Sequence, residues 1–81
     1  MKATVYVTLK PDVLDPQGRA IQRACGSLGY EGITDVRQGK LFEVTLATAD
    51  RGAAERLLAE LCEKLLANPV IEDSRVERIE E

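Results

Sequence analysis

The fold depends on one stretch in the middle of the chain, Val36-Arg37-Gln38-Gly39-Lys40-Leu41-Phe42-Glu43-Val44-Thr45-Leu46. Its apolar residues Val36, Phe42, Val44 and Leu46 share one parity, and this parity continues through Gly39. A two-residue hairpin would therefore turn the later apolar side chains away from the core. Two interpretations remain: a three-residue loop at 38–40, or one long bent strand. Gly39 suits either, as a left-handed loop residue or as a bulge.

Strand patterns lie at both ends of the chain. In residues 3–9, Val5 and Val7 alternate with polar residues, which predicts a strand with one buried face, and Pro11 ends it. Near the C-terminus, apolar residues with polar alternates predict a last strand. They are Val70, Ile71, Val76 and Ile79.

Two helices are predicted between these strands. Asp15-Pro16 is a typical helix start, and Gly29 suits a left-handed C-terminal cap. The first helix carries an apolar stripe of Ala20, Ile21, Ala24 and Leu28. The second begins near Asp50, its expected cap, and runs to about residue 67, before Pro69. Its broad apolar face is formed by Ala54, Leu57, Leu58, Leu61, Cys62, Leu65 and Leu66.

This order predicts an α+β fold with a single domain over residues 1–81. Half-buried strands beside helices with one apolar face indicate a two-layer sandwich, a mainly antiparallel sheet with two helices on one face. If residues 33–48 fold back, the topology is ferredoxin-like. If they do not, part of that strand projects from the monomer and invites pairing with a second copy. A chain of 81 residues buries a small core, which also favours an oligomer.

The composition argues against catalysis by this chain. It has no histidine, which removes the commonest general base and metal ligand and every Cys-His or Ser-His pair. Cys25 and Cys62 lie on apolar stripes and form no Cys-x-x-Cys pair, so we expect buried, reduced thiols and no metal site. Glu72 and Asp73 are adjacent, so in a strand they point to opposite faces.

Binding to nucleic acid or membrane is also not expected. The net charge is −3 with both signs interspersed, and the chain has three aromatic residues, Tyr6, Tyr30 and Phe42. No apolar run reaches the roughly 20 residues that cross a bilayer, and the first residues lack the apolar region of a signal peptide. We therefore expect a cytoplasmic protein.

Several segments together carry a family resemblance: Tyr6 to Lys10, Val13 to Gly18, Leu28-Gly29, Asp35 to Arg37, Gly39-Lys40, Glu43, and Leu61 to Asp73. In order and spacing they resemble the PurS-type small subunit of bacterial phosphoribosylformylglycinamidine (FGAM) synthase. One departure is Ser74, where PurS-type chains often carry an aromatic residue, so a partner contact at that position is in doubt.

The resemblance implies a noncatalytic subunit of a complex in the fourth step of purine biosynthesis. It implies a homodimer or a dimer of dimers that bridges a large PurL-type synthetase and a PurQ-type glutaminase and supports glutamine-dependent ammonia transfer. ATP and magnesium are used by the synthetase subunit, and no cofactor is implied for this chain. The alternative is a free-standing ACT-like regulatory domain that binds a small metabolite at a dimer interface.

No residue is expected to be catalytic. The pattern and the expected exposure instead indicate a set of interface candidates at the first helix start, the middle strand region and the second helix stop. They are Asp15, Gln17, Gly18, Arg37, Gly39, Lys40 and Asn68.

Overall fold

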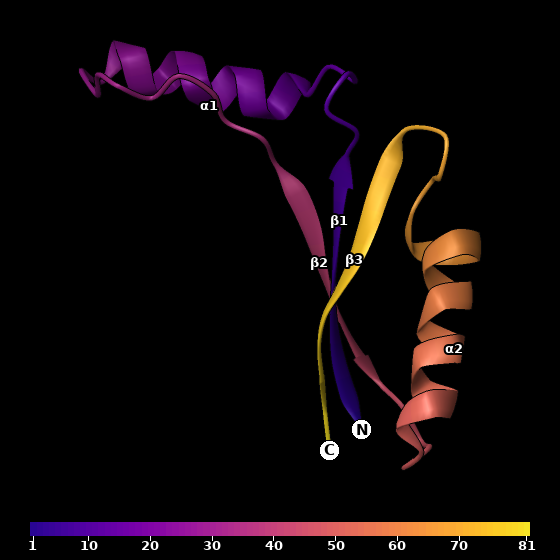
Figure 1. Cartoon of the computed structure of the whole chain (residues 1–81). Helices are drawn as coiled ribbons and strands as arrows, with labels where there is room; N and C mark the ends of the chain where they lie inside the picture. Colours follow the sequence, from indigo (N-terminus) through magenta and orange to yellow (C-terminus); the bar gives the residue numbers. More distant parts are fainter.

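The computed structural model describes residues 1–81 as strand, helix, strand, helix, strand (Figure 1). The elements are β1 (Lys2–Leu9), α1 (Pro16–Ser27), β2 (Gly39–Thr45), α2 (Arg51–Leu61), a π-helical continuation η1 (Cys62–Leu66), and β3 (Glu72–Glu80). The predicted α+β class and element order are confirmed.

The three strands form one antiparallel sheet in the order β2-β1-β3. Val5 of β1 lies opposite Phe42 of β2 and Val76 of β3. The register with β3 shifts between Thr4 and Val5, which marks a bulge. The bulge explains how Val76 and Ile79, three residues apart, both lie opposite the buried side of β1.

One face of the sheet is covered by α2, and the core lies between them. Its buried members are Ala3, Val5, Val7, Leu46, Ala54, Leu58 and Cys62, with Phe42, Val44, Leu66 and Ile79 among the partly buried residues packed against it. Cys62 is thus a buried free thiol, as predicted, whereas Cys25 is half-buried. Three residues that were expected in the same apolar face are not buried: Leu57 and Leu65 are exposed, and Leu61 is half-buried.

The middle region contains no hairpin. β2 begins only at Gly39, and residues 33–38 belong to no strand. The chain passes from these residues into β2 without reversing direction (Figure 1). The three-residue loop is therefore wrong, and the regular strand is shorter than the long-strand alternative. Similarly, Val70 and Ile71 lie in the turn before β3 instead of within the strand.

The capping residues predicted from the sequence lie at the observed helix ends. Asp15 is the N-cap of α1, Pro16 occupies its first turn, and Asp50 caps α2. Gly29 has φ of +87°. The Tyr30 N–H donates to the Cys25 carbonyl oxygen at 2.9 Å, which completes a Schellman cap.

Only α2 lies over the sheet, however. α1 extends past the end of the strands, on the side of β2 (Figure 1), and makes no extensive contact with another element. The radius of gyration is 16.0 Å, against about 12 Å for a compact chain of this length. The expectation of two helices on one face is therefore not met within one chain. We call α1 and the residues that follow it, 16–35, the arm.

Candidate functional site

The arm joins the sheet through two short segments, residues 10–15 and 36–38, which we call the neck. Asp15 connects them. One of its carboxylate oxygens accepts from the Gly18 N–H at 3.0 Å, and the other accepts from the Gln38 N–H at 2.6 Å. The Asp15 side chain is buried, although the residues on either side are exposed. One carboxylate thus caps α1 and fixes the start of the arm to the segment that enters β2.

The environment of Asp15 favours its charged form. The hydrogen bond from the Gln38 N–H lowers the pKa of this carboxyl most, followed by the bond from the Gly18 N–H. Desolvation acts in the opposite direction, while the nearby charge of Arg37 lowers the pKa further. The net direction is downward, so Asp15 is an anion at neutral pH.

Arg37 connects the same two segments from the other side. Its Nη2 donates to the carbonyl oxygens of Lys10 at 2.9 Å and Val13 at 3.0 Å, with a longer contact to Leu9 at 3.5 Å. A guanidinium can serve several acceptors at once because its donors are fixed in one plane. Arg37 and Asp15 thus tie the outgoing and returning segments of the neck together.

Gly18 allows the arm to approach the neck closely. A Cβ atom at this position would collide with the carbonyl oxygen of Val36 and lie 2.9 Å from Oδ2 of Asp15. Because these neighbours include the backbone and the capping carboxylate, a side chain cannot be accommodated by a simple rotamer change. The sequence requirement for glycine here is steric.

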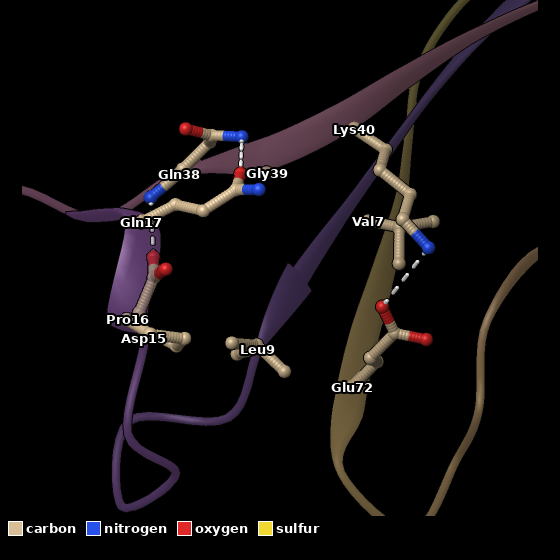
Figure 2. A pocket seen from close by; sticks show the side chains of 9 residues that line it. All are labelled: Val7, Leu9, Asp15, Pro16, Gln17, Gln38, Gly39, Lys40 and Glu72. Carbon is tan, nitrogen blue, oxygen red and sulfur yellow. Dashed lines mark hydrogen bonds and ion pairs between the residues drawn. The ribbon is translucent and has the colours of Figure 1, made fainter.

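Beside the neck lies an open hollow of about 240 Å³ (Figure 2). It is lined by Val7, Leu9, Asp15, Pro16, Gln17, Gln38, Gly39, Lys40 and Glu72. Figure 2 shows the Gln38 amide directed at the Gln17 carbonyl oxygen on one side and Lys40 directed at Glu72 on the other. The polar groups on each side of the hollow are therefore paired with one another.

The Lys40–Glu72 pair links the far strands of the sheet across β1, with Nζ and Oε2 3.6 Å apart. The other oxygen of Glu72 accepts from the Asn68 N–H at 2.7 Å. The Asn68 side chain accepts from the Val70 N–H at 3.1 Å. Glu72 therefore connects the turn after α2 to the start of β2.

Gly39 packs closely against β1: a Cβ atom at this position would lie 2.7 Å from the Val7 carbonyl oxygen.

The structure thus brings the interface candidates into one region. Six of them line the hollow or hold the neck, and Asn68 joins through Glu72. Glu72 and Gln38 were not among the candidates, although they complete the two pairs. In the structure Glu72 lies opposite Leu9 and shares its face with Ser74 and Val76, the face that packs toward α2. The sequence did not identify this face, because Ile71 and Ile79 have the opposite parity to Val76.

The structure offers no cluster of three or more side chains suited to binding a metal ion. None of the helices is long and apolar enough to cross a membrane.

Comparison with known proteins identifies the family to which the chain is similar. The family model PurS, described as phosphoribosylformylglycinamidine (FGAM) synthase, matches residues 2–80. The chain is 54% identical to the phosphoribosylformylglycinamidine synthase subunit PurS of Bacillus subtilis, over 94% of this chain and 89% of that protein. The B. subtilis PurS structure superposes with a TM-score of 0.83 and covers 94% of each chain.

Two further solved structures extend the likeness. PurS of Methanocaldococcus jannaschii is 42% identical, with a TM-score of 0.82 over 98% of both chains. A chain in the structure of PurLQS from Thermotoga maritima is 25% identical, with a TM-score of 0.83 over 98% of this chain and 99% of that one. The neck, the hollow and the fold are thus those of a chain that belongs to the PurS family.

Proposed function

We propose that this chain is the noncatalytic PurS subunit of FGAM synthase in purine biosynthesis, and that it bridges the synthetase and glutaminase subunits. The observation that carries this function is the family match over residues 2–80, together with the structural likeness, at a TM-score of 0.83, to a chain of the T. maritima PurLQS structure. The same match speaks against a free-standing ACT-like regulatory domain.

The site chemistry supports a role in assembly instead of catalysis. Asp15 and Arg37 direct their hydrogen bonds at backbone groups of the chain itself. Lys40 and Glu72 neutralise one another. None of these groups forms a nucleophile and base within hydrogen-bond reach. In this proposal ATP and magnesium belong to the synthetase subunit, this chain holds no cofactor, and the complex is cytoplasmic.

The small core supports self-association within the complex. Only nine of 81 residues are buried, which is few for a chain that must also hold a projecting arm. We propose a homodimer as the unit that meets the two partner subunits.

The decisive experiment is reconstitution of product formation. The PurL-type and PurQ-type subunits are assayed with and without this chain, using either glutamine or free ammonia as the nitrogen donor. We expect only the glutamine-dependent reaction to require it, because free ammonia bypasses the bridge. A glutamine-dependent rate that is the same with and without this chain would refute the proposal.

A further inference from the structure

A second hollow, of about 350 Å³, lies on the arm, where the segment after α1 runs back alongside the helix (Figure 1). The Gln22 side-chain amide donates to the Thr34 carbonyl oxygen at 2.8 Å and holds this segment against α1. We call the depression the arm hollow, and it shares no residue with the hollow beside the neck. It is lined by Arg19, Gln22, Arg23, Gly26, Tyr30 and Ile33.

Two arginines of the arm hollow have no acidic partner in the chain. Arg37 is held by backbone carbonyl oxygens, whereas Arg19 and Arg23 are exposed and form no ion pair. They lie four residues apart, so their side chains stand on one face of α1. Most other cations of the chain are already paired with a carboxylate: Lys10, Lys40, Arg51, Lys64, Arg75 and Arg78.

The placement of these two charges does not stabilise α1. Arg19 lies in the first turn, near the positive end of the helix dipole, where a cation is unfavourable. Arg23 repels it, because like charges four residues apart destabilise a helix. The first turn holds no acidic residue, and the Asp15 carboxylate is engaged with backbone N–H groups. Charges that oppose the local fold are expected where a function requires them.

Apolar surface adjoins the two charges. Tyr30 is 63% and Ile33 is 46% exposed. The apolar stripe of α1, with Ile21 and Leu28, lies on the opposite side of the helix, as the spacing of 3.6 residues per turn requires. An occupant of the arm hollow therefore leaves that stripe free for other contacts.

The combination of arginine and tyrosine is typical of a protein–protein contact, because both residues are enriched at the centre of interfaces. A guanidinium pairs well with a carboxylate or a phosphate. A small phosphate compound would meet two exposed cations and leave Tyr30 and Ile33 uncovered. A polypeptide segment can pair with the cations and cover both apolar side chains. The observations therefore favour a protein occupant.

We infer that the arm hollow receives an acidic segment of a partner subunit. Its carboxylates pair with Arg19 and Arg23, and an apolar side chain of the same segment packs on Tyr30 and Ile33. This inference rests on the proposed bridging function and assigns one of its contacts to the arm. The contact should weaken as salt is added, because ions screen exposed charges that pair across an interface.

Charge reversal tests the pairing. The double variant Arg19→Glu/Arg23→Glu should fold, because both side chains are exposed and an acid in the first turn suits the helix dipole. The concentration that half-saturates its assembly with the PurL-type and PurQ-type subunits should rise at least about tenfold, and less at high salt. Analytical ultracentrifugation measures assembly, and far-ultraviolet circular dichroism measures folding.

The matched control is Arg56→Glu, because Arg56 is an exposed arginine of α2 that also forms no ion pair. This variant should assemble like wild type. An unchanged assembly of the double variant, or an equal loss in the control, would overturn the inference.

A zero-length cross-link identifies the occupant even if charge reversal prevents folding. Arg23→Lys keeps the positive charge and introduces an amine, which a carbodiimide joins to a carboxylate in contact with it. Mass spectrometry of the assembled complex should find position 23 joined to an Asp or Glu of a partner subunit, whereas position 56 of Arg56→Lys should not be joined. Linkage of position 23 to this chain or a second copy alone would overturn the inference.

Inorganic phosphate and ATP test for a small anion in the arm hollow. Neither should raise the melting temperature of the wild-type chain above that of the double variant. A rise confined to the wild-type chain would assign the arm hollow to a phosphate ligand and overturn the inference.

Product formation separates this inference from the proposed function. With limiting amounts of the double variant, the glutamine-dependent rate should be lower than with wild type, and high amounts should restore it. If wild type is required and the double variant supports an equal rate at limiting amounts, the arm contact alone fails. If wild type itself is not required, the bridging function fails.

Discussion

Replacing Gly18 by alanine should disturb the attachment of the arm, although alanine is the better helix former. Gly18 lies in the first turn of α1, with its Cα against the neck. An added methyl group would collide with the Val36 carbonyl oxygen and press on the Asp15 carboxylate. Relief requires the first turn of α1 to move away, which weakens the hydrogen bond that joins Asp15 to the Gln38 N–H.

The magnitude follows from two opposing effects. Alanine in a helix is worth about 0.5–1 kcal/mol more than glycine. Overpacking against groups that cannot rotate away costs about 1–3 kcal/mol, and more where the backbone itself is the neighbour. We therefore expect Gly18→Ala to lower the free energy of unfolding by about 1–2 kcal/mol in net.

Gly26 provides a matched control in the same helix. No atom lies within 4 Å of a Cβ built at Gly26, and its φ is not positive. Gly26→Ala should therefore raise the free energy of unfolding by about 0.5–1 kcal/mol. The same glycine-to-alanine substitution should therefore lower the free energy of unfolding at position 18 and raise it at position 26.

Urea unfolding at one fixed protein concentration measures both variants, because any dimer makes apparent stability depend on concentration. The urea midpoint should fall for Gly18→Ala and rise for Gly26→Ala. A Gly18→Ala chain at least as stable as wild type would show that the close approach of the arm to the neck does not exist in solution.

Three further outcomes are expected. Leu58 is fully buried, so Leu58→Ala should lower the free energy of unfolding by about 2–5 kcal/mol; a loss under 1 kcal/mol in urea would contradict this core. Because the pKa of Asp15 is lowered in the folded chain, its stabilisation is complete above its unfolded pKa, about 3.9, and is lost as pH falls through the lower folded value. The stability difference between wild type and Asp15→Asn should therefore shrink below about pH 4 in acid titrations. Arg37→Glu should keep the sheet folded but reduce co-elution with the two partner subunits, whereas Arg56→Glu, on the exposed surface of α2, should not.

The parts of this fold that could be predicted from the sequence depend on neighbours along the chain. The caps at Asp15 and Asp50 and the turn at Gly29 act within a few residues, so each predicts a helix boundary from local chemistry. The alternation in β1 predicts its buried face for the same reason. The candidates chosen at the start of the first helix and the end of the second fall in one region because the antiparallel pairing of β1 with β3 places Leu9 opposite Glu72.

The placement of α1 could not be predicted, because an apolar stripe does not specify which chain covers it. Ile21 and Leu28 have the same periodicity whether they face their own sheet or another copy. The difference lies in contacts between distant residues: Asp15 with Gln38, and Arg37 with the Lys10 carbonyl. In the sequence these residues resemble an ordinary helix cap and a solvated turn. Asp15 and Arg37 thus fix the two segments of the neck against each other, and α1 extends from them past the end of the sheet, a placement that depends on contacts no local sequence pattern specifies.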